Sequence, residues 1–279
     1  MSPPAKPFDG RLVPHATKPI HVDDPETVRG FLESDPVGNA FVVNWAFHQT
    51  GRDVYADRLP PQAVLTSSHG DPPMTFRFCG LTATDAAAAD AVLRAAAPGQ
   101  AFLFVSDLGL LESVRRNTDV GKIRPAWLYR LGPEDFVDVH DHEVRPVPPS
   151  FAPMIATLWE PEWEAAPYIR NRLESGPSVG IFDGDELVAW YGTHIVTDRV
   201  AMMGFLHVLE GYRHRGYARS LSCALAKEIF RGGRIPACHV YVDNEPSLRL
   251  MDSLGLRRVR QQAFVEVEFR TRPEGWRTR

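Results

Sequence analysis

The chain contains only three cysteines, Cys79, Cys223 and Cys238, among its 279 residues. Because their number is odd and their spacing is wide, they match neither a disulfide framework nor a zinc site. Free cysteine is among the most buried residue types. We therefore expect three reduced thiols that pack as small apolar side chains.

Long apolar runs are also missing. The sequence nowhere gives the roughly 18 uninterrupted apolar residues that a membrane-spanning helix needs. The opening Met-Ser-Pro-Pro-Ala-Lys-Pro has no apolar run behind its lysine, so it does not resemble a secretory signal. We therefore expect no membrane partner and a cytoplasmic location.

An excess of basic charge is the third absence. Lys and Arg number 31 against 35 Asp and Glu, and the formal net charge at pH 7 is -4. A protein-wide basic field for nucleic acid is therefore missing, and we expect no nucleic-acid partner. A local basic patch around a small anionic ligand is compatible with this charge.

The composition that remains is typical of a globular protein with many turns. Hydrophobic residues make up 44% of the chain, charged residues 24%, and there are 24 prolines. At roughly 100–200 residues per domain, the length favours two units. The proline-rich residues 1–20 indicate a loosely held arm, residues 21–137 an α/β domain, and residues 138–279 a second domain.

Apolar spacing in the first half alternates between helical and strand periods, which predicts a mixed α/β domain. A turn-rich segment between two strand patterns predicts a hairpin. The expected helices span 24–32, 40–47, 84–97 and 108–116, and the expected strands span 62–66, 74–78, 101–105 and 126–131. Near the predicted boundary, His140 and His142 flank Asp141. Two ligands without a third nearby indicate a solvated linker rather than a metal site.

The second half has the same mixture and shows no repeat of fixed period. Asp183-Gly-Asp185 is a favourable turn between two strands, so we expect a hairpin there. The expected helices span 151–159, 163–174, 217–230 and 246–254, and the expected strands span 178–182, 187–191, 200–209, 237–242, 256–260 and 263–269.

One segment of this half combines the features of a phosphate site. Residues 213–218 lie between a predicted strand and a predicted helix, and a helix start presents free N–H groups and partial positive charge. Gly216 lets the backbone approach a ligand, and Ala218 keeps the first helical turn thin. The basic side chains here are Arg213, His214, Arg215 and Arg219. The sequence therefore predicts a site for a diphosphate, with no metal.

Arg213-x-x-Gly216-x-Ala218 resembles the coenzyme A loop of the GNAT superfamily of N-acyltransferases. The loop in that superfamily reads Gln or Arg, two residues, Gly, one residue, then Gly or Ala. The likeness continues in Val240-Tyr-Val-Asp-Asn244, Ser247, Leu250 and Gly255-Leu256. It is strongest to the glycine N-acyltransferase-like and FR47-like branch and covers residues 143–270. In the first half, only Asp35-Pro-Val-Gly-Asn39 is faintly similar to the degenerate GNAT-like domains that precede such modules.

The resemblance implies a GNAT fold in the second half, with a mixed and splayed sheet. It also implies acetyl-CoA or another acyl-CoA as co-substrate and direct attack by an amine, without an enzyme nucleophile. The pantetheine arm would contact Leu206, His207 and Val208. The diphosphate would contact Arg213, His214, Arg215, Gly216, Tyr217 and Ala218. Asn244 and Ser247 would touch the far side of the cofactor.

The groups that move protons are less evident. Many GNAT enzymes have a tyrosine acid directly after the residue that corresponds to Leu250, but this chain has Met251 there. The strand before the loop has no carboxylate, so His207 is the candidate base, because imidazole titrates near neutral pH. His194, on the preceding strand, is a weaker candidate. Tyr241 is the candidate acid, and Glu210 is expected to be solvated.

Three functions remain open on these residues. The first is an N-acyltransferase that acts on a small amine or amino acid, and the second is an acyl-CoA-binding regulatory protein without catalysis. The third is a protein N-acetyltransferase. A pocket closed by the aromatic residues Trp159, Trp163, Trp190 and Tyr191 would favour a small acceptor. A dinucleotide-binding domain is disfavoured because the loop lacks Gly-x-Gly-x-x-Gly.

Overall fold

The structure, a computed structural model, describes residues 18–49, 51–68, 77–139, 141–159 and 164–270. Most of the expected arm, most of the expected strand at 74–78, His140 and Trp163 lie outside these ranges. Among the described helices, none is both long and apolar enough to cross a membrane. The three cysteines are buried and unbridged, which confirms the expectation of free thiols.

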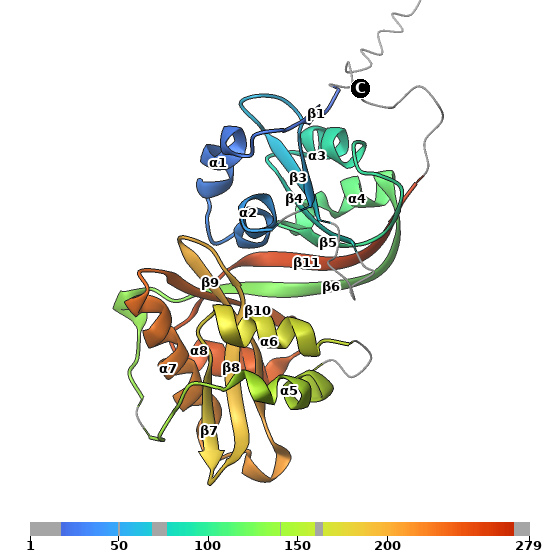
Figure 1. The fold of residues 1–279 in the computed structure, drawn as a ribbon. Helices are drawn as coiled ribbons and strands as arrows, with labels where there is room; N and C mark the ends of the chain where they lie inside the picture. Colours follow the sequence, from blue (N-terminus) through green and yellow to red (C-terminus); the bar gives the residue numbers. More distant parts are fainter. Residues whose placement is uncertain (1–17, 50, 69–76, 140, 160–163, 271–279) are drawn as a thin grey trace, which may run out of the picture.

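The first half forms the upper part of the molecule in Figure 1. Its helices are α1 (Glu26–Glu33), α2 (Ala40–Phe47), α3 (Ala86–Leu93) and α4 (Leu111–Asn117), with a 3-10 turn η1 (Leu108–Leu110) before α4. Its strands are β1 (Ile20–His21), β2 (Arg52–Ala56), β3 (Ala63–Ser68), β4 (Arg77–Ala83), β5 (Gly99–Val105) and β6 (Thr118–Arg130). The predicted mixed α/β character is confirmed. β3 and β4 pair antiparallel, as the predicted hairpin requires, but β4 begins at Arg77 and runs to Ala83, beyond the strand expected at 74–78. β1 and β2 were not expected from the sequence.

The second half forms the lower part. Its helices are α5 (Ala152–Trp159), α6 (Ala166–Ser175), α7 (Tyr217–Arg231) and α8 (Glu245–Ser253). Its strands are β7 (Val179–Asp183), β8 (Glu186–Val196), β9 (Val200–Val208), β10 (Ile235–Tyr241) and β11 (Arg257–Phe269). The two strands expected at 256–260 and 263–269 are one strand, β11, which has register shifts at Arg258/Arg260 and Val265/Val267 where it pairs with β6.

All strands belong to one mixed sheet in the order β1-β2-β3-β4-β5-β11-β6-β10-β9-β8-β7. The final strands of the two halves have changed places: β11 pairs with β5, and β6 pairs with β10. Figure 1 shows β6 and β11 side by side across the middle of the molecule. The sheet therefore runs unbroken across the boundary predicted near residue 138, and that boundary stays a prediction.

The two halves repeat one order of elements. Apart from the short β1, each has two helices, three antiparallel strands, a helix, a strand parallel to the previous one, another helix and a long last strand. The parallel units are β4-α3-β5 and β9-α7-β10. The repeat lies in the order of elements rather than in the residues, since the sequence shows no fixed period.

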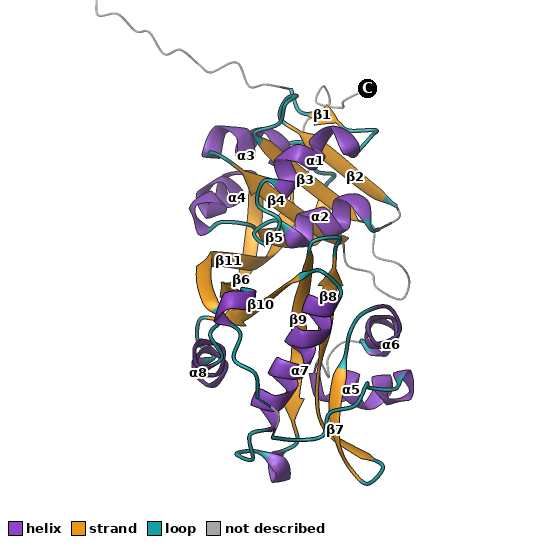
Figure 2. Cartoon of the chain, turned by 90° about the vertical axis from the view of Figure 1, so that its left-hand side faces the viewer, coloured by secondary structure: helices purple, strands orange, loops and turns teal. Residues whose placement is uncertain are grey.

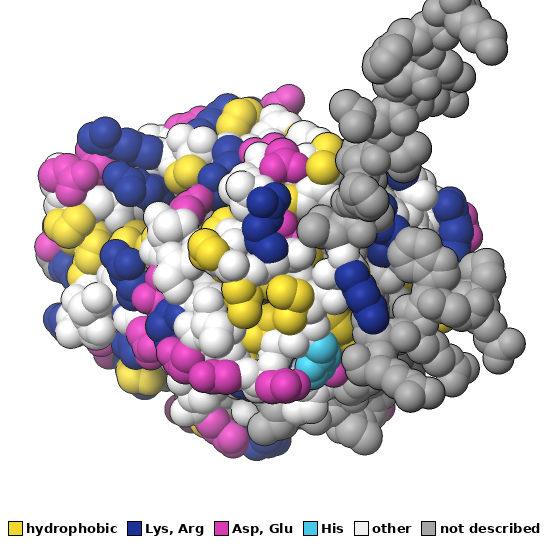
Figure 3. All heavy atoms as spheres, turned by 90° about the horizontal axis from the view of Figure 1, so that it is seen from above, with side chains coloured by type: hydrophobic (Ala, Val, Ile, Leu, Met, Phe, Trp, Pro, Cys, Tyr) yellow, Lys and Arg dark blue, Asp and Glu magenta, His cyan; other side chains and the backbone are white. Residues whose placement is uncertain are grey.

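Helices cover both faces of the sheet in each half (Figure 2). In the first half, α3 and α4 pack with Leu65 and Leu103 on one face, and α1 and α2 pack with Val64 and Phe104 on the other. In the second half, α7 and α8 share a cluster with Met203 and Cys238, while α5 and α6 pack with Trp190 and Phe205. On the end of the molecule drawn in Figure 3, basic and acidic side chains are interspersed.

Candidate functional site

A cleft of about 440 Å³ lies between the end of β9 and the starts of α7 and α8. It is large enough to hold part of a small-molecule ligand. Of the residues predicted to hold the cofactor, the cleft is lined by Leu206, His207, Val208, Arg213, His214, Gly216, Tyr217, Ala218 and Ser247. Tyr212, Arg219, Pro246 and Leu250 complete its wall. Segments that are 40 residues apart in sequence thus meet around one opening.

The cleft opens where two parallel strands separate. β10 pairs with β9 only from Ile235 to Cys238, opposite Val200 to Met203, and the rest of β10 pairs with β6 alone. Beyond Met203, β9 contains a bulge at which Phe205 adopts a left-handed φ of 49°. The bulge bends the strand and turns its last residues away from β10. This is the splayed sheet that the sequence resemblance implied.

The start of α7 presents unused backbone donors to the cleft. Gly216 occupies the N-cap position with φ 83°, a left-handed conformation that favours glycine, and no side chain caps the helix. His214 is also left-handed, with φ 62°. Among the described residues, no protein acceptor receives the N–H groups of residues 214–218. An anion placed here would meet several free donors and the positive end of the helix dipole.

Guanidinium groups add positive charge around the same turn. Arg213 donates through Nε to the carbonyl oxygen of Val208 at 3.3 Å, and Arg215 donates to that of Gly211 at 3.0 Å. No carboxylate among the described residues forms an ion pair with Arg213, Arg215 or Arg219. Arg213 and Arg219 line the cleft, whereas Arg215 lies outside its wall, over the ring of Tyr212. The uncompensated charge favours an anionic ligand.

His142 is docked on this turn instead of lying in a solvated linker. Its Nδ1 is 2.8 Å from the Ser220 hydroxyl, and its ring packs edge-on against Tyr217 with centroids 4.7 Å apart. A methyl group added to Gly216 would approach His142 Cε1 to 3.4 Å. The expectation of a solvated linker was therefore wrong for His142, because the chain folds back over the first turn of α7.

Asn244 and Ser247 form a capping hydrogen bond at the start of α8. The Asn244 side-chain oxygen accepts a hydrogen bond from the Ser247 N–H at 3.2 Å, which makes Asn244 the N-cap of the helix. Ser247 lines the cleft and Asn244 does not. Met251, at the position of the usual tyrosine acid, is 2% exposed and lies 3.5 Å from the Cys238 sulfur. Met251 is thus a core residue.

His207 lies on the wall of the cleft, half-buried. Its ring stacks on Trp190 with centroids 4.8 Å apart and an interplanar angle of 20°. Burial, and after it the positive charge of Arg213, lowers the pKa of His207 below its ordinary value. The imidazole is therefore neutral at pH 7 and has a lone pair with which to accept a proton.

Tyr241 is not among the described residues that line the cleft. It ends β10, three positions after the last residue that pairs with β9. The Arg124 guanidinium carbon lies 4.0 Å from the centre of its ring, and Phe264 packs edge-on against it. Its role as an acid stays a prediction, and so does the assignment of His207 as base.

His194 is partly buried on the face that α5 and α6 cover. Its Nδ1 is 2.8 Å from the Tyr168 hydroxyl, and its ring lies 5.3 Å from that of Trp159. Burial, then repulsion by the protonated form of His239 and by Arg172, lowers the pKa of His194 to about 4. A Cβ at Gly204 would come within 1.9 Å of the imidazole, so this glycine makes room for the ring.

The expected aromatic pocket is only partly assembled. Trp190 and Tyr191 are neighbours on β8, so their side chains point to opposite faces of the sheet. Trp190 belongs to the cluster with α5 and α6, and Tyr191 to the cluster with α7. Trp159 is on the same side as Trp190. Strand alternation therefore excludes Tyr191 from a shared wall, and the position of Trp163 lies outside the described residues.

Comparison with known proteins places these observations in a family context. Residues 178–265 match the model of the FR47-like protein family. No curated protein matches the chain. A Drosophila protein of solved structure has a TM-score of 0.71 and 17% identity, covering 89% of this chain and 98% of that protein.

Two further solved structures resemble the chain over most of its length. A GNAT-family protein from Novosphingobium aromaticivorans has a TM-score of 0.54 and 19% identity, over 89% of this chain and all of that one (100%). A tandem GNAT protein from the clavulanic acid biosynthesis pathway has a TM-score of 0.53 and 13% identity, over 90% and 97%. Because the sequence identities are this low, the similarity shows a shared fold alone. The chain therefore has the GNAT fold and carries an FR47-like segment in its second half, which confirms the resemblance drawn from residues 213–218.

Proposed function

We propose that the chain is an N-acyltransferase that moves an acyl group, most simply acetyl, from an acyl-CoA to a small amine or amino acid. The observation that carries the proposal is the uncapped start of α7 beside the splayed strands. Free N–H groups, two unpaired arginines and the separated end of β9 converge on one cleft. This arrangement suits a diphosphate followed by an extended pantetheine arm.

The cleft residues fit such a co-substrate in detail. Beyond Met203, the last residues of β9 are released from β10 on one side, so their backbone groups can bond to the amides of the pantetheine arm. Leu206 and Val208 provide apolar wall, while Arg213 and Arg219 add charge at the other end. A cleft with one apolar and one basic end matches the two ends of coenzyme A.

The chemistry needs two proton movements. The amine nitrogen attacks the thioester carbonyl carbon, the N–C bond forms, the C–S bond breaks, and the thiolate leaves. The attacking nitrogen must lose a proton, and the sulfur must gain one. Neutral His207 on the cleft wall supports the first step, directly or through water. Tyr241, on the separated end of β10, is our proposed donor for the second step.

Cofactor binding is tested by thermal unfolding with and without coenzyme A and acetyl-CoA. We expect a ligand-dependent rise in Tm for the natural chain and none for Gly216→Glu. Gly216→Ala is the matched control, because both variants place a side chain at a left-handed φ but only Glu adds negative charge. We expect Gly216→Ala to keep a reduced rise in Tm. An equal rise in all three proteins would place the cofactor elsewhere.

Catalysis is tested by acyl-CoA-dependent thiol release over a panel of small amines and amino acids. A second candidate function, an acyl-CoA-binding protein without turnover, is favoured by one observation. Met251 fills the usual acid position as a buried core residue. A rise in Tm with acetyl-CoA, together with no thiol release from any acceptor, would select this second function.

A further inference from the structure

A second cleft, of about 460 Å³, lies in the first half at the ends of β4 and β5. Its wall includes Thr82 from the end of β4, Asp85 from the start of α3, and Ser106 and Asp107 from the turn after β5. Asn39 at the start of α2 and Arg260 of β11 close it from other sides.

This cleft is the counterpart of the first one in the repeated fold. The first cleft lies where β9 ends and α7 and α8 begin, and the second where β4 ends and α3 and η1 begin. In both halves the helix connects two parallel strands. Equivalent positions in the two halves thus form a cleft, and their chemistry can be compared directly.

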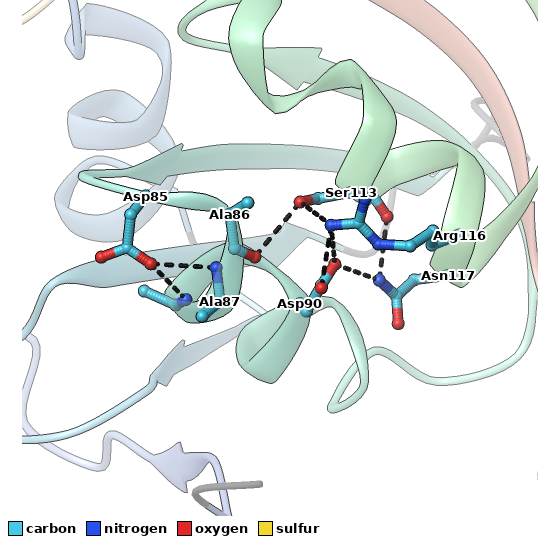
Figure 4. A network of polar contacts seen from close by, with 8 residues as sticks. Asp85, Ala86, Ala87, Asp90, Ser113, Arg116 and Asn117 are labelled. Carbon is cyan, nitrogen blue, oxygen red and sulfur yellow. Dashed lines mark hydrogen bonds and ion pairs between the residues drawn. The ribbon is translucent and has the colours of Figure 1, made fainter. Parts of the chain in front are cut away.

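The chemistry of the second cleft is the reverse of that of the first. Asp85 accepts hydrogen bonds from the N–H groups of Ala87 at 2.9 Å and Ala88 at 3.0 Å, so its carboxylate caps α3, as Figure 4 shows. These bonds, first of all the one from Ala88, lower the pKa of Asp85. Asp107 accepts from the Gly109 N–H at 2.7 Å. Donors that would receive a diphosphate are therefore already occupied by carboxylates.

The charge of the wall is also negative. Asp35, Asp85 and Asp107 line the cleft against one cation, Arg260. Arg260 is held by Asp35 at 2.6 Å and by the Ser106 carbonyl oxygen at 3.0 Å. Arg58, which is not on the wall, pairs with Asp57 and attracts the Asp85 carboxylate only as the smallest cause of its lowered pKa. Two of the three carboxylates are thus without a basic partner on the wall.

An independent observation points to a missing hydrogen-bond donor. Asn39 is 4% exposed and donates its amide to the Leu32 carbonyl oxygen at 3.0 Å. Its side-chain oxygen accepts no hydrogen bond from any described residue, although it is buried. A buried acceptor without a partner costs about 1–3 kcal/mol, so a donor that satisfies it would be bound favourably.

We propose that this second cleft binds a small organic cation that carries a primary ammonium or guanidinium group. Such a group offers several N–H donors and no acceptor, as the wall requires. Its positive charge would lie between Asp85 and Asp107, near the unpartnered oxygen of Asn39. The half-buried ring of Phe31, also on the wall, suits the apolar part of the ligand or its charge.

The test is calorimetric titration of the full chain with putrescine and with agmatine, which carry an ammonium and a guanidinium group. The neutral diol of the same length, 1,4-butanediol, is the ligand control. The double variant Asp85→Asn with Asp107→Asn removes both charges and keeps both caps, because asparagine caps helices as well as aspartate does. We expect this variant to bind the cation at least tenfold more weakly and to keep its Tm.

Asp24→Asn is the matched protein control, since the Asp24 carboxylate also accepts from a backbone N–H at a helix start, that of Glu26, but is not on the cleft wall. It should bind like the natural chain. Coenzyme A should raise the Tm of all these proteins equally. A failure of cation binding at the second cleft can therefore be distinguished from a failure of coenzyme A binding at the first. The proposal fails if neither cation binds, if the diol binds equally well, or if the double variant binds within threefold of the natural chain.

Discussion

His207 lies on the cleft wall, and its pKa is lower than that of an ordinary histidine. Trp190, which is 1% exposed, covers one face of its ring, and Arg213 adds positive charge nearby. Both effects disfavour the imidazolium form. If His207 accepts the proton of the attacking amine, activity must depend on its neutral fraction.

We expect kcat/KM to fall as the pH drops through the lowered pKa of His207, because protonation removes the lone pair. The midpoint of this acid limb should lie below 6.5, the value of an unperturbed imidazole. His207→Gln should lower the rate by about 100-fold and abolish the limb. The pH profile of thiol release measures both. The exposed His48 provides the control variant His48→Gln, and an unchanged limb in His207→Gln would show that the base is another group.

Arg213 is expected to contribute to cofactor affinity by charge. Arg213→Gln should weaken coenzyme A binding about tenfold, a loss of about 1.4 kcal/mol. Arg231→Gln, at the far end of α7 and paired with Glu228, should leave the affinity unchanged. Titration calorimetry at 0.05 and 0.5 M salt tests whether charge is the cause. Salt screens charges, so the loss of coenzyme A affinity in Arg213→Gln should be smaller at the higher concentration. An effect that is insensitive to salt would argue for a packing role instead.

The start of α8 allows a structural role of Asn244 to be distinguished from a role in binding the cofactor. The sequence resemblance places Asn244 against the cofactor, while the structure makes it the N-cap of α8. Asn244→Asp should keep the cap, and Asn244→Ala should lower the free energy of unfolding by about 1 kcal/mol. Urea unfolding measures this difference.

Measuring the coenzyme A affinity of the same two variants tests whether the Asn244 side chain also contacts the cofactor. If Asn244 acts only as a cap, Asn244→Asp should bind with nearly natural affinity. If its side chain touches the cofactor, the added negative charge of Asn244→Asp should weaken binding as well. A tenfold loss in both variants, with the fold intact in Asn244→Asp, would support the contact that the resemblance implied.

At the scale of the whole molecule, the exchanged strands make each half depend on the other. β6 belongs to the first half in sequence but joins β10 to β11, and β11 belongs to the second half but joins β5 to β6. A cut at residue 138 would leave β10 and β5 with unpaired edges. Exposed strand edges present unpaired N–H and C=O groups, which pair with other chains and lead to aggregation.

We therefore expect the separately produced fragments 1–137 and 138–279 to show no cooperative thermal unfolding. When the fragments are refolded together, they should form a complex that unfolds in one transition, because the exchanged strands then find their partners. Circular dichroism melts and gel filtration measure both results. A fragment 138–279 that melts cooperatively as a monomer would show that the second half does not need β6.

Features that depend on residues close together in the chain could be predicted from the sequence. A nearly continuous apolar run indicated β9, helical spacing indicated α7, and Gly216 between them indicated a turn with a free helix start. These features follow from backbone preferences and side-chain periods that act over a few residues. The residues expected to hold the cofactor could therefore be named, and most of them line one cleft.

The contacts between segments far apart in the chain became evident from the folded structure alone. A strand with a suitable apolar pattern can pair with several partners. The local sequences of β6 and β11 therefore do not indicate that these strands exchange positions between the two halves. The bulge at Phe205, the docking of His142 on α7 and the carboxylate-lined second cleft depend likewise on register and packing across many residues. Local patterns thus located the loop that we propose binds coenzyme A, whereas long-range strand pairing built the single sheet and placed a basic cleft in one repeated half and an acidic cleft in the other.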